Sequence, residues 1–210
     1  CYLSTVCVSI FIYADDILLI APTVTGLQTL VNICENELNN IDMCINAKKS
    51  VCIRFGSNYS NFCENITSLN GAKFAWVDNC RYLGVYFVSG RLFRCSFSNA
   101  KCQFYKSFNS IFSKVGCSAS EEVILSLIRA KCLPCLLYGV EACPFFKRDK
   151  HSFDFSMTRI FMKIFKTGSS AVVVECQKQF NFLPLKFQVD IRTANFMTQF
   201  MSTDNFVCTL

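Results

Sequence analysis

Apolar residues near the start of the chain occur in two runs that a short acidic segment separates. The runs are Val6–Tyr13 and Ile17–Ile20, and both are rich in β-branched and aromatic residues. The segment Ala14-Asp15-Asp16 between them suits a tight turn, so the pattern predicts the two antiparallel strands of a hairpin. Because both strands are apolar on both faces, we expect the hairpin to lie inside a layered α/β core.

The next stretch changes to the period of an amphipathic helix. Thr25 and Gln28 have the spacing of a capping box, which predicts the start of that helix. Its apolar stripe consists of Leu27, Leu30, Val31, Cys34, Leu38 and Ile41. Short strands are then expected at Val51–Phe55, Ala72–Trp76 and Tyr82–Val88.

From about Ser96 the pattern is helical. One predicted stripe, which Gly116 closes as a C-cap, consists of Ala100, Phe104, Phe108, Ile111, Phe112 and Val115. Ser118 and Glu121 form a second capping box, and Pro134 must end or kink the helix that follows.

Two further helical segments complete the chain. The first has a stripe of Phe153, Met157, Ile160, Phe161, Ile164 and Phe165, and it ends near Gly168. The second is Glu175–Phe200, with a break at Pro184. Aromatic stripes at helical spacing are typical of a core, so we expect these Phe residues to be buried rather than to stack on bases.

The change of pattern near residue 90 predicts an α+β chain of two parts. Residues 1–90 carry five Lys/Arg and seven Asp/Glu, a net charge of −2, whereas residues 91–210 carry sixteen and eight, a net charge of +8. The asymmetry indicates a part that holds metal ions and a part that holds a polyanion. Two ordinary solvated surfaces would be the alternative.

Composition excludes several classes of protein. The chain is 52% hydrophobic and 17% charged, against a usual charged share of about 25%, which predicts surface that a partner or another part of the same polypeptide covers. The 15 cysteines are odd in number and scattered through apolar runs, which is typical of buried thiols in a reducing compartment.

The pair Cys132/Cys135 lacks further zinc ligands, and His151 stands alone. Asp15 and Asp16 interrupt the longest apolar stretch, so we expect no membrane span.

The pair Asp15 and Asp16 is the clearest candidate for chemistry. Adjacent carboxylates between apolar strands repel each other and lose hydration unless something compensates them. A divalent cation such as Mg²⁺ does so, because it binds a few carboxylate oxygens and completes its shell with water and phosphate oxygens. The alternative is a hairpin turn with two exposed aspartates, which are common turn residues.

The sequence around these acids resembles a known family. Tyr13-Ala14-Asp15-Asp16, followed by Ala21-Pro22 and an amphipathic helix, resembles motif C of reverse transcriptases. The resemblance implies a polymerase palm in which Asp15 binds metal and Asp16 supports it, with Mg²⁺ as the cofactor.

Two later segments resemble further motifs of the family in the expected order. Ile45–Ser50 resembles motif D, which points to Lys49 as a catalytic residue near the pyrophosphate leaving group; an exposed Lys in a loop is the alternative. Tyr82-Leu83-Gly84-Val85 resembles motif E, which implies that Tyr82, Leu83 and Gly84 belong to the primer grip, a hairpin that holds the primer end.

Segments of the second part narrow the resemblance to non-LTR (LINE-type) reverse transcriptases. Lys131–Ala142 is similar to their thumb, and Phe182-Leu183-Pro184-Leu185 to the segment that follows it. The resemblance implies that the basic helices contact phosphates of a template–primer duplex, with Lys101, Lys106, Lys114, Arg129 and Lys131 as the leading candidates. A merely solvated helix face is the alternative for each of them.

The resemblance also implies what the chain needs. Motif A, which supplies another metal-binding Asp, and motif B precede this hairpin in the family, so we expect the chain to be an internal part of a longer polypeptide and inactive alone. The implied partners are an RNA template, a DNA primer, dNTPs and the missing N-terminal palm and fingers, in an intracellular protein, nuclear or cytoplasmic. Two other hypotheses stay open: a non-catalytic remnant of a decayed element with residual nucleic-acid binding, and a helical scaffold with a chance Tyr-Ala-Asp-Asp.

Overall fold

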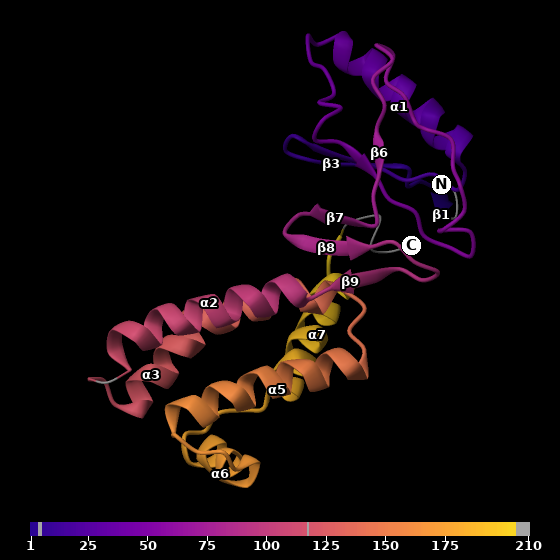
Figure 1. Ribbon diagram of the computed structural model, residues 1–210. Helices are drawn as coiled ribbons and strands as arrows, with labels where there is room; N and C mark the ends of the chain where they lie inside the picture. The colour runs from indigo at the N-terminus through magenta and orange to yellow at the C-terminus, as the bar shows by residue number, and fades with distance from the viewer. Residues whose placement is uncertain (4–5, 117, 205–210) are drawn as a thin grey trace. The chain divides into compact units, whose positions relative to one another are not determined.

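The computed structural model describes residues 1–3, 6–116 and 118–204. It divides the chain into two compact units, which we treat separately. The strand-rich unit comprises Cys1–Cys80 and Phe87–Phe93, and the helical unit comprises Arg81–Tyr86 and Arg94–Asp204. Small antiparallel sheets and many helices (Figure 1) confirm the α+β prediction.

The strand-rich unit is built from short strands and one long helix. Its elements are β1 (Tyr2–Leu3), β2 (Val6–Cys7), β3 (Ile10–Tyr13), β4 (Asp16–Leu19), α1 (Val24–Asn39), β5 (Val51–Cys52) and β6 (Ala75–Trp76). β1 pairs with β2 and β3 with β4, both antiparallel, whereas β5 pairs with β6 in parallel. The predicted hairpin is therefore present, but the first predicted strand is interrupted at Val8 and Ser9.

Helix α1 packs on β4 and on the segment before β6. Its buried Val31 forms a small core with Ile66 and Phe74, against which Leu19 and Leu27 pack. The predicted helix is thus confirmed, but its N-cap is Thr23, whose side chain accepts a hydrogen bond from Gly26 N–H. Gln28, which we assigned to a capping box, instead bonds both the N–H and the carbonyl of Thr67. The predicted capping box was therefore wrong, because the side chain of Gln28 forms two hydrogen bonds with a distant backbone group in place of one at the helix start.

A three-stranded sheet in the order β7-β8-β9 follows, formed by β7 (Asn79–Tyr82), β8 (Val85–Val88) and β9 (Arg94–Ser96). The periodicity predicted one strand over Tyr82–Val88, whereas the resemblance to motif E implied a hairpin at Tyr82–Val85. The structure has a turn at Leu83–Gly84, where both residues have positive φ, +46° and +82°. Two consecutive positive φ values are the signature of a type I′ hairpin turn, which the apolar run conceals because Leu rarely takes this conformation.

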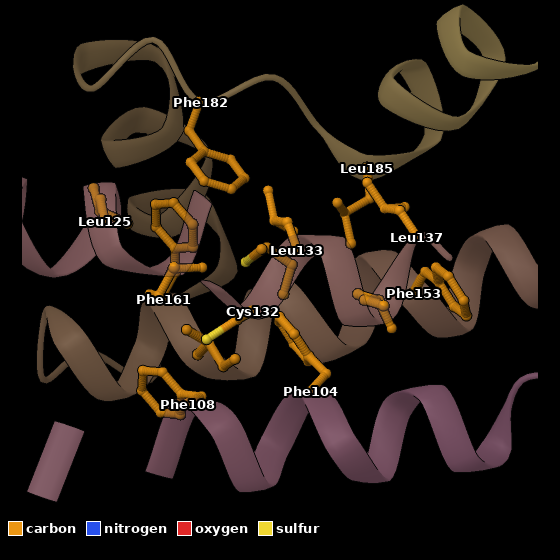
Figure 2. Packing of buried hydrophobic residues seen from close by; sticks show 14 of the residues in the cluster. Phe104, Phe108, Leu125, Cys132, Leu133, Leu137, Phe153, Phe161, Phe182 and Leu185 are labelled. Atoms are coloured by element: carbon orange, nitrogen blue, oxygen red, sulfur yellow. The ribbon is translucent and has the colours of Figure 1, made fainter. Parts of the chain in front are cut away.

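The helical unit has one large core. Its helices are α2 (Ser98–Val115), α3 (Glu121–Leu127), a π-helical segment (Ile128–Cys132), α4 (Leu133–Leu136), a 3₁₀ turn (Val140–Ala142), α5 (Lys147–Ile164), α6 (Ser170–Gln179) and α7 (Leu185–Met201). Figure 2 shows Phe104, Phe108, Phe153 and Phe161 pointing into the space between the helices, and each is at most 1% exposed. The prediction that the aromatic stripes form a core is confirmed.

Pro134 disturbs the helix in which it lies, as predicted. The N–H of Leu133 donates to the carbonyl of Ile128, five residues back, so the chain widens into a π-turn before α4 begins. Proline lacks an N–H and its ring clashes with the carbonyl four residues earlier, here that of Ala130; a widened turn relieves that clash.

Two predicted helix ends differ from the structure. Ser120 caps α3 by accepting from Val123 N–H, and Ser118 does not. Lys166, with φ +51°, takes the left-handed position after α5 in place of Gly168. Gly116 is the C-cap of α2, as predicted, although its φ of −64° is right-handed. The patterns locate a helix to within a turn, and packing selects the exact cap.

One run of the helical unit contradicts the expectation that no stretch could span a membrane. Glu121–Ala142 has 22 residues and an 18-residue window of mean hydropathy 1.7, so by length and composition it could cross one. Core helices of soluble proteins meet the same test. Here Ile124, Leu125 and Ile128 are each at most 2% exposed within the helical core, which accounts for the apolar composition.

Candidate metal and primer-binding residues

The two acids lie at the tip of the β3–β4 hairpin. Ile10 pairs with Leu19 and Tyr13 with Asp16, which leaves Ala14 and Asp15 as a two-residue turn. Ala14 has φ +53°, a conformation that costs a residue with a Cβ about 1 kcal/mol. The turn therefore places Asp15 beyond the last strand pair and Asp16 at the first position of β4.

Both aspartates are exposed, and no salt bridge of the described residues involves them. Two neighbouring carboxylates without a cationic partner offer oxygen ligands of the kind that a hard divalent cation prefers. They fit such an ion in part only, because no group of three or more His, Cys, Asp or Glu among the described residues could hold a metal. A complete site needs a further ligand.

The hairpin that carries the acids is not buried, contrary to the sequence prediction. Ile12 is 70% exposed and Tyr13 64%, and Ile10 and Ile20 are exposed as well. One residue of the hairpin, Leu19, packs on the core around Val31. The prediction of burial failed because an apolar strand indicates only that burial would be favourable. It does not indicate which other element packs on the strand.

Lys49 lies in the turn just before β5 and is exposed. The backbone N–H groups of Lys48 and Lys49 donate to the side-chain oxygen of Asn46, which fixes this turn. No hydrogen bond or ion pair of the described residues links Lys49 to Asp15 or Asp16. Its catalytic role stays a prediction.

The predicted primer-grip residues form the end of the β7–β8 hairpin. Tyr82 ends β7, and Leu83 and Gly84 form the turn. This turn belongs to the helical unit, where the Tyr138 hydroxyl donates to the carbonyl of Leu83 over 3.0 Å. Tyr138 lies in the segment that resembles a thumb, but no pattern in the sequence marks it as a site residue. Only the contact, 55 residues away along the chain, identifies it.

The predicted phosphate-binding residues of α2 differ in their surroundings. Lys106 and Lys114 are exposed. The ammonium group of Lys101 donates to Ser152 Oγ of α5 at 2.8 Å, and Lys163 of α5 donates to Asn109 of α2 at 3.1 Å while lying over the ring of Phe112. Two lysines, Lys101 and Lys163, thus lie at the contact between helices α2 and α5.

The guanidinium of Arg129 has an intramolecular role that the sequence did not indicate. It donates to the carbonyls of Phe180 and Asn181, at 2.8 and 3.1 Å, and lies 5.1 Å from the ring centre of Phe182. It therefore ties the π-helical segment to the connection between α6 and α7. Lys131, two residues on, is exposed. Contact of either residue with phosphate stays a prediction.

One comparison with known proteins found a match to part of the chain. Residues 3–87 match the family model for reverse transcriptase (RNA-dependent DNA polymerase), and polymerases of this family generally use divalent metal ions. The matched segment contains Asp15, Asp16, Lys49 and the turn at Leu83–Gly84. Searches of curated proteins and of solved structures found no significant match. Residues 3–87 are thus reverse-transcriptase-like.

Proposed function

We propose that this chain is part of the RNA-directed DNA polymerase of a non-LTR retrotransposon. Residues 1–90 would be the C-terminal part of its palm, and residues 91–210 its thumb. The observation that carries the proposal is the exposed Asp15-Asp16 pair on the turn of an antiparallel hairpin, inside the segment that matches reverse transcriptases. The intact protein would be intracellular, nuclear or cytoplasmic.

In this proposal Asp15 binds Mg²⁺ directly and Asp16 supports it. Asp15, with Asp16 and a further acid, would hold metal ions that would supply charge stabilisation to the attacking primer hydroxyl and the leaving pyrophosphate. The third acid comes from another part of the polypeptide, so the chain alone does not polymerise. Lys49 acts near the leaving group of the dNTP.

The helical unit in turn holds the RNA template and DNA primer. Support comes from the net charge of +8 over residues 91–210 and from the exposed lysines Lys106, Lys114 and Lys131. Contacts with phosphates give affinity that is independent of sequence and is weakened by salt. This surface therefore supplies duplex affinity and the acidic turn supplies chemistry.

Replacement of Asp15 by Asn in the full reading frame that contains the chain tests the proposal. We expect primer extension to fall by about 100-fold or more, because metal-assisted charge stabilisation is worth several kcal/mol. Duplex binding should change little, since the proposed contacts with phosphates are made by lysines and not by Asp15. Asp42→Asn is the matched control: Asp42 is an exposed aspartate of the same unit with φ +57°, a conformation that Asn tolerates well.

Extension that survives Asp15→Asn would remove Asp15 from the mechanism. Loss of extension in the Asp42 variant as well would indicate misfolding rather than chemistry. If the genomic frame upstream holds a stop codon or a frameshift, the chain is instead a non-catalytic remnant, and duplex binding is the only activity expected of it.

A further inference from the structure

The turn at Leu83–Gly84 is held by residues of the helical unit rather than by its own strands alone. The Tyr138 hydroxyl donates to the carbonyl of Leu83, and Tyr138 lies between α4 and the 3₁₀ turn Val140–Ala142. Its neighbour Leu137 is 2% exposed and Val140 1%, so the backbone that carries Tyr138 is anchored in the large core. The hydroxyl therefore reaches the turn from a rigid base.

Two glycines make this close approach possible. A Cβ on Gly84 would lie 2.8 Å from Cε1 of Tyr138, and a Cβ on Gly139 would lie 2.9 Å from Cγ2 of Val85. Real Cβ atoms do not approach other heavy atoms so closely, and both glycines also have positive φ, +82° and +67°. Gly84 thus leaves room for the side chain of Tyr138, and Gly139 leaves room for the side chain of Val85.

The exposure of Tyr138 indicates that this contact is not ordinary core packing. The side chain is 57% exposed, so its ring lies on the surface against Gly84 instead of filling the interior. A tyrosine in such a position contributes little to hydrophobic stability. What its hydroxyl and ring do is fix the conformation of a two-residue turn.

We propose that Tyr138 and Gly139 are positioning residues that hold the Leu83–Gly84 turn in place for the end of the primer strand. The proposal rests on the proposed function, since it takes the turn to be a primer-binding element. Because Tyr138 belongs to the same unit as the lysines that we assign to duplex binding, the primer terminus and the duplex are held by one unit. Loosening the contact should impair the use of primer and leave the use of dNTP unchanged.

Two variants test this inference, each with a matched control. Tyr138→Phe removes only the hydroxyl, and its control Tyr59→Phe alters a tyrosine, 40% exposed, in the strand-rich unit. Gly84→Ala introduces the clash with Tyr138. Its control Gly71→Ala imposes the same strain, φ +77°, at a position where a Cβ would meet nothing within 4 Å.

The first measurement is amide hydrogen exchange of the peptide that spans residues 81–86. We expect Tyr138→Phe to accelerate exchange there by about fivefold, the effect of one net hydrogen bond on local opening. Tyr59→Phe and Gly71→Ala should leave that peptide unchanged. Unchanged exchange in both Tyr138→Phe and Gly84→Ala would overturn the inference.

The second measurement is steady-state primer extension by the full-length protein. We expect Tyr138→Phe to raise the KM for primer–template several-fold, while kcat and the KM for dNTP stay near their original values. An unchanged primer KM despite faster exchange would overturn the positioning role. If the unaltered protein extends no primer, the proposed function fails, and hydrogen exchange alone then decides whether Tyr138 fixes the turn.

Discussion

The two units of this protein differ in how well they bury their apolar residues. The helical unit has a continuous core in which four phenylalanines are at most 1% exposed: Phe104, Phe108, Phe153 and Phe161. The buried core of the strand-rich unit consists of Val31, Ile66 and Phe74. In the same unit Ile12 is 70% exposed and Phe62 95%.

This difference indicates where the protein's stability comes from. Full burial of a large apolar side chain contributes about 1.5–3 kcal/mol, so the helical core outweighs the smaller one several times. The strand-rich unit, which carries the acidic turn, gains little from its uncovered strands. Chemistry is thus proposed for the less stable unit and duplex binding for the more stable one.

Truncation of a core phenylalanine should give the largest effect. We expect Phe161→Ala to lower the free energy of unfolding by about 3–5 kcal/mol, because it leaves a cavity that helices cannot easily collapse. Ile12→Ala, at an exposed strand position, should change it by less than about 0.5 kcal/mol. Urea denaturation measures both. A large cost at Ile12 would show that the exposed hairpin face is covered in solution, and would remove the contrast between the units.

The helix caps should give effects of intermediate size. Ser120→Ala removes the side-chain acceptor for Val123 N–H in the helical unit, and Thr23→Ala removes the acceptor for Gly26 N–H in the strand-rich unit. Each should cost about 1 kcal/mol. Hydrogen exchange should show that the strand-rich unit opens more often than the helical unit after an equal loss of free energy, because the strand-rich unit is less stable to begin with. The controls Ser118→Ala and Thr25→Ala should have almost no effect, and an equal effect would mean that the caps are misassigned.

Alkaline pH should have no effect at neutrality and an effect that grows above pH 9. Burial, helped by the neighbouring Cys143 thiol, raises the pKa of Cys95 from 9.0 to about 12, and burial raises that of Cys132 to about 11. A raised pKa means that the folded state favours the neutral thiol, so this stability is complete below pH 9 and is lost as pH rises toward 11–12. Denaturation at pH 8, 10 and 11 measures the loss, which Cys132→Ala should reduce. Among the described residues of the strand-rich unit, Cys52 is the one thiol whose pKa burial raises as far, to about 11, so the helical unit should lose more stability.

Local pattern predicted much of the fold and the position of the acids. The hairpin around Asp15, helix α1 and the stripes of α2 and α5 were found from periodicity, because alternation and helical spacing are properties of neighbouring residues. The exact caps were missed, since Ser118 and Ser120 meet the same local criteria. Periodicity also missed the turn at Leu83–Gly84, which lies inside an apolar run and which only the resemblance to motif E implied.

The candidate site was predicted less completely than the fold. The sequence predicted Asp15, Asp16, Lys49 and the cationic residues, and the structure shows where each of them lies. The intramolecular contacts of Arg129 and the contact of Tyr138 with Leu83 were not foreseen. Both join residues more than 50 positions apart, and such pairs leave no periodic signal.

The sequence by itself determined which segments are strands or helices, where two acids meet at a turn, and which part carries positive charge. Only the tertiary structure decided which apolar faces are covered, which serine caps a helix, and which glycines admit a tyrosine and a valine from across the unit. The physical reason is that periodicity and turn chemistry act between near neighbours, whereas burial and close approach depend on the closure of long loops. The partners of such contacts are chosen by the fold as a whole.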